Sequence, residues 1–181
     1  MDDTCRDISV TCIAPTKTFN LAGLQTAAVY AENSILHHRM WRQLNTDEVA
    51  EPNAFAIQAT IAAFQYGEEW LDELREYVEK NKQYVTEFLQ EKIPLIHPVA
   101  GDATYLMWLD CRKITESGRQ FVKFIRKTSG LYVSGGNQYG RGGEGFLRVN
   151  VATSKLVVED GMQRLYCLLY TSPSPRDMRR S

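Results

Sequence analysis

The sequence has no long apolar run, no large excess of one charge and few cysteines. No stretch of its 181 residues approaches the roughly 20 apolar residues of a transmembrane helix. A formal net charge of −1, without a basic stripe interleaved with aromatics, gives no reason to expect nucleic acid or a membrane as partner. The first residues do not resemble a signal peptide, and the four scattered cysteines contain no Cys-x-x-Cys pair. We therefore expect a cytoplasmic protein.

Familiar catalytic and metal-binding motifs are also scarce. The sequence shows no serine-histidine-acid motif, and His97 has no obvious partner. His37 and His38 are adjacent, so on a helix they would point about 100° apart and could not bind one metal together. The loop 140–145 fits the dinucleotide fingerprint G-x-G-x-x-G, but a strand is expected after it where that motif needs a helix. We expect this loop instead to bring backbone close to an active site.

The sequence does contain an alternation of strand and helix patterns. The longest predicted helix carries an apolar stripe at i, i+3, i+4 and i+7, and the run 104–110 is apolar on both faces, which is typical of an inner strand. Strands interleaved with helices predict an α/β sandwich. We expect helices at 35–44, 51–66, 68–93, 116–128 and 155–165, and strands at 8–13, 25–31, 95–99, 104–110, 131–133 and 145–153.

Lys17 lies just after an apolar run and just before a loop of small residues. The run 8–13 predicts a buried strand, and Pro15 ends it because proline has no backbone N–H. A lysine kept partly out of water loses its proton more readily and can act as an amine nucleophile toward an aldehyde. A surface lysine in a turn is the more frequent explanation of such a position, so the spacing alone leaves both open.

The residues around this lysine, Ala14-Pro-Thr-Lys-Thr-Phe-Asn-Leu-Ala-Gly-Leu24, resemble the lysine motif of fold-type I pyridoxal-phosphate enzymes. The branch they resemble most contains the MalY/PatB-type cystathionine β-lyases and the class I/II aminotransferases. The resemblance extends to about residue 165. It implies that Lys17 is the catalytic lysine that binds pyridoxal 5'-phosphate covalently. Thr16 is a candidate for hydrogen bonding to the cofactor phosphate, with stabilisation of the turn as the alternative.

Arg148 lies within an otherwise apolar strand. The strand period places Arg148 on the opposite face from Leu147 and Val149. An arginine in such a position needs an anion, which is either a structural carboxylate or a ligand, and its planar fork suits bidentate binding of a carboxylate. The stretch 145–152 resembles the substrate-binding arginine strand of the same family, which implies that Arg148 binds the α-carboxylate of an amino-acid substrate.

The resemblance implies a pyridoxal-phosphate-dependent C–S β-lyase that converts cystathionine or a cysteine conjugate into pyruvate, ammonia and a thiol. A class I/II aminotransferase is the alternative, because both reactions begin with removal of the α-proton. A non-enzymatic binding or interaction domain is the competing class. Family members are usually homodimers, so a homodimer is expected for the full-length enzyme.

The resemblance also implies a domain organisation, that of the C-terminal part of an enzyme with the aspartate aminotransferase-like fold. Residues 1–45 are then the end of the large cofactor-binding domain, and residues 46–166 are the small α/β domain with a long linking helix. In residues 167–181 Pro, Ser and Arg replace the helical periodicity, which predicts a non-native, disordered tail, with a genuine basic tail as the alternative. Since the rest of the cofactor site would be missing, we expect the fragment alone to be inactive or nearly so.

Overall fold

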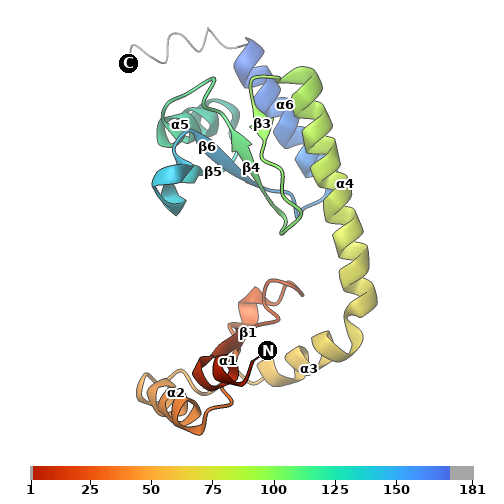
Figure 1. Cartoon of the computed structure of the whole chain (residues 1–181). Coiled ribbons are helices and arrows are strands. Elements are labelled where there is room, and N and C mark those ends of the chain that lie inside the picture. The colour runs from red at the N-terminus through yellow and green to blue at the C-terminus, as the bar shows by residue number, and fades with distance from the viewer. Residues whose placement is uncertain (1, 172–181) are drawn as a thin grey trace. The chain divides into compact units, whose positions relative to one another are not determined.

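The computed structural model describes residues 2–171 of the chain (Figure 1). Contacts between residues divide it into two compact units, Met1–Leu74 and Arg75–Ser181, and the division falls within the long helix α4 (Glu68–Lys92). The domain boundary predicted at 45/46 is the one between the large and small domains of the full-length enzyme, and it stays a prediction. Within the described residues, no helix combines the length and the apolar character needed to cross a membrane.

The N-terminal unit is built from short strands and helices. Its strands β1 and β2 pair antiparallel, with Cys12 opposite Val29. The prediction of a buried strand over 8–13 is wrong. Ile8 is the last residue of helix α1, and the strand β1, which covers only Thr11–Ile13, is exposed. The elements of this unit are α1 (Asp3–Ile8), β1 (Thr11–Ile13), the 3-10 helix η1 (Ala22–Leu24), β2 (Ala28–Tyr30), α2 (Ser34–Thr46), α3 (Ala56–Tyr66) and the first turns of α4.

Helix α2 begins one residue earlier than the sequence predicts, and its cap is Asn33. The Asn33 side-chain oxygen accepts hydrogen bonds from the backbone N–H groups of Ile35 at 2.8 Å and Leu36 at 3.2 Å. These bonds satisfy two of the donors that a helix leaves unpaired at its start. Helix α3 ends at Tyr66, where the helix predicted over 51–66 also ends, and the N–H of the next residue, Gly67, donates to the Ala63 carbonyl at 3.0 Å.

The C-terminal unit is an antiparallel sheet with helices packed on it. The strand order is β3-β4-β6-β5, so β4 is an inner strand as predicted, whereas the predicted strand at 131–133 is wrong. Arg75 to Lys92 of α4 precedes β3. The other elements are β3 (His97–Pro98), β4 (Leu106–Asp110), α5 (Gly118–Ser129), β5 (Ser134–Gly135), the 3-10 helices η2 (Gly136–Tyr139) and η3 (Arg141–Gly143), β6 (Phe146–Asn150) and α6 (Lys155–Thr171).

Helix α6 is longer than the periodicity of the sequence predicts. It continues to Thr171, so residues 167–171, which the sequence assigns to a tail, are helical. The remainder of the predicted tail, 172–181, lies outside the described residues. The added turn contributes to packing, because Leu168 is buried. Helices α4 and α6 meet through an edge-on contact between Phe88 and Tyr166.

The core of the C-terminal unit lies on one face of its sheet. The buried polar residue Asn81 ties α4 to the sheet, because its side-chain amide donates to the carbonyls of Val151 at 2.9 Å and Thr153 at 3.0 Å. The other face carries Trp108 and Arg148, which alternate along their strands with buried leucines. The apolar core side chains with at most 2% exposure are Val85, Leu89, Ile93, Ile96, Leu109, Cys111, Phe121, Ile125, Leu147, Val151, Met162 and Leu165.

Candidate active site

Lys17 lies in the turn that comes after β1. The Phe19 N–H donates to the Pro15 carbonyl at 2.9 Å, and the Leu21 N–H donates to the Thr16 carbonyl at 3.0 Å, so the backbone closes around the lysine. The Lys17 side chain is exposed and makes no hydrogen bond or ion pair with residues 2–171. Of the two alternatives that the spacing leaves open, the structure has the lysine in an exposed turn, and the amine is free to meet a ligand.

An aromatic contact holds this turn against helix α3. The Phe19 ring packs edge-on against Phe64, with centroids 5.4 Å apart, and stacks on Trp70 at 6.4 Å. Sequence reasoning missed this anchor, although an aromatic residue two positions after the lysine was a usable signal. Thr16 is half-buried, and its hydroxyl has no hydrogen-bond partner in the described part of the chain. The structure thus places Thr16 and Lys17 in one turn with both side-chain polar groups unpaired.

Arg148 lies in the C-terminal unit, at the middle of β6. In register it stands between Trp108 of β4 and Ser134 of β5. Its side chain is half-buried, and its guanidinium carbon lies 4.2 Å from the centre of the Tyr139 ring. Arg148 forms no ion pair with any residue between 2 and 171. The strand face predicted for Arg148 is confirmed, since Leu147 beside it is 1% exposed.

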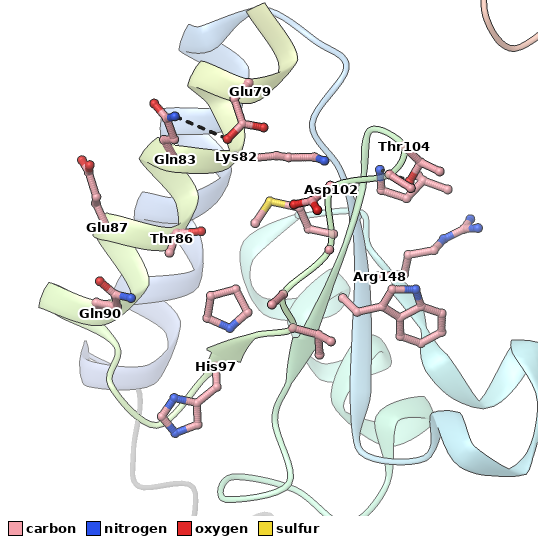
Figure 2. Close-up of a pocket in the computed structure, with 18 residues that line it drawn as sticks. Glu79, Lys82, Gln83, Thr86, Glu87, Gln90, His97, Asp102, Thr104 and Arg148 are labelled. Atoms are coloured by element: carbon pink, nitrogen blue, oxygen red, sulfur yellow. Dashed lines mark hydrogen bonds between the residues drawn. The ribbon is translucent and has the colours of Figure 1, made fainter. Parts of the chain in front are cut away.

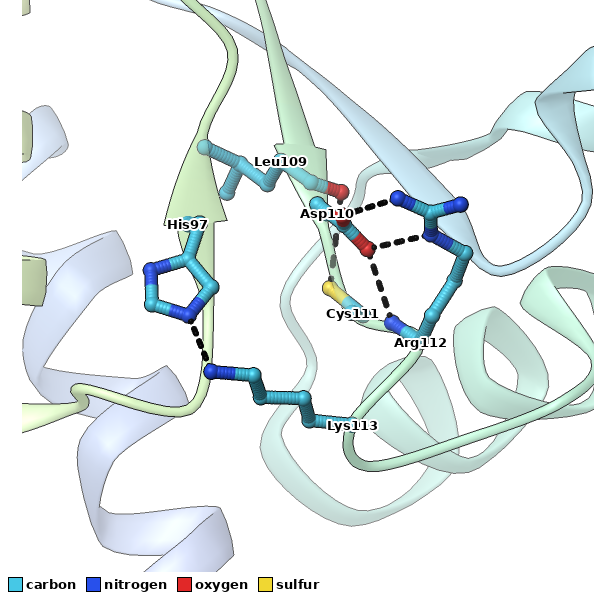
Figure 3. Close-up of polar contacts among 6 residues, drawn as sticks. All are labelled: His97, Leu109, Asp110, Cys111, Arg112 and Lys113. Carbon is cyan, nitrogen blue, oxygen red and sulfur yellow. Dashed lines mark hydrogen bonds and ion pairs between the residues drawn. The ribbon is translucent and has the colours of Figure 1, made fainter.

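A second arginine on the same side of the sheet is already neutralised. Asp110 accepts from Arg112 Nε at 2.9 Å, from Arg112 Nη2 at 2.7 Å and from the Arg112 backbone N–H at 3.0 Å (Figure 3). The hydrogen bonds from Arg112 lower the pKa of Asp110 to about 2. Arg112 also lies over the Phe146 ring, 4.9 Å from its centre. Of the two arginines, only Arg148 therefore lacks an internal anion within the described residues.

A groove of about 920 Å³ extends along the sheet edge to Arg148. In Figure 2, Lys82 extends from α4 toward the loop that carries Asp102 and Thr104, and Arg148 extends from β6 beyond the same loop. Acidic and basic side chains both line the groove, so its charge does not by itself select an anion. The unpaired guanidinium of Arg148 is the feature of the groove that favours an anion.

Two other reactive groups lie near β4, one lining the groove and one buried in the core. The His97 Nε2 atom is 2.9 Å from Lys113 Nζ, a pairing that the sequence did not indicate (Figure 3). Burial, together with the nearby Asp110 carboxylate, raises the pKa of the Cys111 thiol to about 12, so it stays protonated and is a poor nucleophile. Within residues 2–171, no group of His, Cys, Asp and Glu side chains is arranged to hold a metal ion.

Lys17 and Arg148 belong to different units, and the geometry above describes each in its own unit. Both carry an unpaired cationic side chain on a defined backbone element. A primary amine and a guanidinium are the groups needed to bond an aldehyde and to bind a carboxylate.

Comparison with known proteins agrees with this chemistry. The family model for aminotransferase class I and II matches residues 6–165. The chain is 37% identical over 169 residues to cystathionine beta-lyase PatB of Bacillus subtilis (strain 168), covering 93% of this chain and 44% of PatB. It is 31% identical over 150 residues to protein MalY of Escherichia coli (strain K12), covering 82% and 38% of the two chains.

Among solved structures, cystalysin from Treponema denticola, which contains a pyridoxal 5'-phosphate cofactor, superposes with a TM-score of 0.89 at 25% identity. The match covers 94% of this chain and 43% of cystalysin. The chain thus spans less than half the length of the relatives it matches. The aminotransferase-like fold predicted from the sequence is confirmed.

Proposed function

This chain belongs to the family of class I and II aminotransferases, and from that premise we propose that it is part of a pyridoxal-phosphate-dependent C–S β-lyase acting on amino acids. The observation that carries the proposal is the unpaired guanidinium of Arg148 on the open face of the sheet, beside an arginine that is fully paired. The identity to PatB over 93% of the chain favours the lyase reaction within the family.

The groups around Lys17 fit the cofactor. When bound, pyridoxal phosphate draws electrons away from the substrate's α-carbon, which makes the α-proton removable. Lys17 would hold the cofactor through Nζ, and Thr16 would donate its hydroxyl to the phosphate. Both groups are unpaired among the described residues, so neither has to give up an existing contact. A free Lys17 amine is also the base that takes the α-proton.

Arg148 orients the substrate by binding its α-carboxylate. Its guanidinium can donate two parallel N–H···O bonds to one carboxylate, which fixes the direction of the amino acid as well as its position. Loss of the α-proton then allows the C–S bond to break, with the thiol leaving with the bonding electron pair and pyruvate and ammonia forming by hydrolysis.

The second candidate function is transamination, which the description of the family itself favours. Both reactions use the same lysine and the same arginine, and they diverge only after the α-proton has been removed. Incubating the full-length enzyme with cystathionine separates them. A lyase releases pyruvate from cystathionine alone, whereas an aminotransferase forms a keto acid only when a second keto acid accepts the amino group.

The role of Lys17 has a direct chemical test. Borohydride reduction of the full-length enzyme with pyridoxal phosphate should fix the cofactor to the Lys17 peptide, and Lys17→Ala should remove both the label and the activity. Labelling elsewhere, or no labelling, would favour the non-enzymatic binding domain. The 181-residue chain alone should be inactive or nearly so, and robust turnover by it would contradict that expectation.

Assembly and location complete the proposal. We place the enzyme in the cytoplasm as a homodimer that takes a small amino-acid substrate. Free thiols at positions 5, 12 and 111 support a reducing compartment. The large apolar side chains exposed on the N-terminal unit support a protein partner surface there.

A further inference from the structure

Three aromatic rings lie on the same face of the sheet as Arg148, and one of them contacts its guanidinium. Tyr139 lies against the guanidinium at 4.2 Å and meets Trp108 edge-on, with centroids 5.6 Å apart and planes at 80°. Trp108 in turn packs edge-on against Phe146 at 6.3 Å. Trp108 and Phe146 come from the strands themselves, whereas Tyr139 comes from the 3-10 helix between β5 and β6. The position of the Tyr139 ring is therefore set by a loop, whereas the other two rings are positioned by strands.

Close backbone contacts within the loop restrict the position of the Tyr139 backbone. Its two arms touch backbone to backbone, because a Cβ added at Gly136 would lie 2.2 Å from the Gly143 carbonyl oxygen and one at Gly143 would lie 2.1 Å from that of Gly136. Directly after Tyr139, Gly140 has φ 124°, a conformation that favours glycine. Gly136 and Gly143 thus close a tight loop that carries one aromatic ring, and Gly140, the first glycine of the G-x-G-x-x-G match, follows that ring.

The ring and a bound carboxylate would use different sides of the guanidinium. A cation lies over the face of an aromatic ring, whereas a carboxylate binds in the plane of the guanidinium through its N–H edge. Tyr139 can therefore stay in contact while Arg148 binds an anion. Because Arg148 has no internal carboxylate among the described residues, this ring is the contact that fixes the plane of its fork before the ligand arrives.

We propose that Tyr139 is a positioning residue for carboxylate recognition, which holds the Arg148 guanidinium with its N–H edge open and its face covered. The inference rests on the proposed role of Arg148 and extends it to a residue outside the lysine and arginine motifs. Preorganising the fork lowers the entropy lost on binding, so removing the ring weakens carboxylate affinity without removing the charge.

The test uses the 181-residue chain labelled with nitrogen-15, and propionate as the probe. The Arg148 Nε–Hε signal, assigned by its loss in Arg148→Lys, reports both the ring contact and propionate binding. Tyr139→Leu should remove the upfield ring-current shift of that signal and raise the propionate Kd by roughly two- to fivefold. Tyr139→Phe keeps a ring face and should match the wild-type chain.

Tyr132→Leu is the matched control. Tyr132 also carries an arginine on its ring, with the Arg126 guanidinium carbon 4.0 Å from the ring centre, but Arg126, unlike Arg148, does not line the groove. This variant should leave the Arg148 signal and the propionate Kd unchanged. Unchanged amide signals for the buried Leu109 and Ile125 would show that each variant is folded.

Three results would overturn the inference. One is an unchanged Kd in Tyr139→Leu, and another is equal weakening in Tyr139→Phe, which would assign the effect to the hydroxyl. The third is absence of propionate binding by the wild-type chain. None of these results touches cofactor labelling at Lys17, so failure here is distinguishable from failure of the proposed enzyme class.

Discussion

The two units of the chain differ in how far their apolar side chains are buried. In the C-terminal unit, large side chains such as Leu109 and Phe121 are at most 1% exposed. In the N-terminal unit, the buried hydrophobic residues within the described range are two alanines, Ala31 and Ala56. Large side chains there stay open to solvent, with Phe55 75% exposed. One unit therefore has a core of its own, and the other has an apolar surface without one.

The difference indicates what each unit needs to be stable. Burial of apolar area is the dominant favourable term in folding, and a segment that buries little has little to offset its chain entropy. A groove of about 330 Å³ in the N-terminal unit is lined by Ile13, Ile57, Ile61 and Phe64, among others. We expect the polypeptide that the relatives have beyond the matched length to cover this surface.

The sharpest way to test this comparison is to remove similar side chains from the two units. Leu109→Ala opens a cavity in a closed core and should cost about 2–5 kcal/mol in the free energy of unfolding. Ile61→Ala, at a site that is 50% exposed, should change the free energy of unfolding by about 0.5 kcal/mol or less. Urea titrations followed through amide signals of each variant's own unit measure both. Equal costs would mean that the N-terminal unit has a core of its own.

A smaller effect is expected from the buried asparagine of α4. Asn81→Ala leaves the carbonyls of Val151 and Thr153 without their donor and should cost about 1–3 kcal/mol. Asn45 offers a matched control, because its side chain donates to the Trp41 carbonyl at 2.7 Å on the exposed surface of α2. Asn45→Ala should change stability by about 0.5 kcal/mol or less. Similar costs for the two variants would show that burial of the bond does not matter.

The smallest effect concerns the ion pair beside the groove. Because the pKa of Asp110 in the folded chain, about 2, is below its ordinary value of 3.8, the pair stabilises the fold above about pH 4 and this contribution is lost as pH falls toward 2. Arg112 is largely exposed, so we expect this contribution to be small. Arg112→Gln should raise the Asp110 pKa, measured by NMR titration of its carboxyl carbon. An unchanged pKa would contradict the pairing.

Long, strongly periodic segments were predictable from the sequence. The stripe over 68–93 predicts a helix that the structure has at Glu68–Lys92, and the apolar run 104–110 contains the inner strand Leu106–Asp110. The short strands were not predictable in the same way. A strand predicted at 131–133 is absent and pairing occurs at Ser134–Gly135 instead, because the partner strand β6, not local pattern, decides where a short strand forms.

The sequence by itself determined the lysine motif around Lys17, the alternation that puts Arg148 opposite Leu147, and the α/β class of the fold. These depend on local order and on periods of two and 3.6 residues. Only the tertiary structure decided that Asp110 pairs with Arg112 and leaves Arg148 free, and that the glycine loop carries Tyr139 onto that guanidinium. The physical reason is that charges and rings choose partners by distance in space, and the chain brings these residues together only when the sheet has formed.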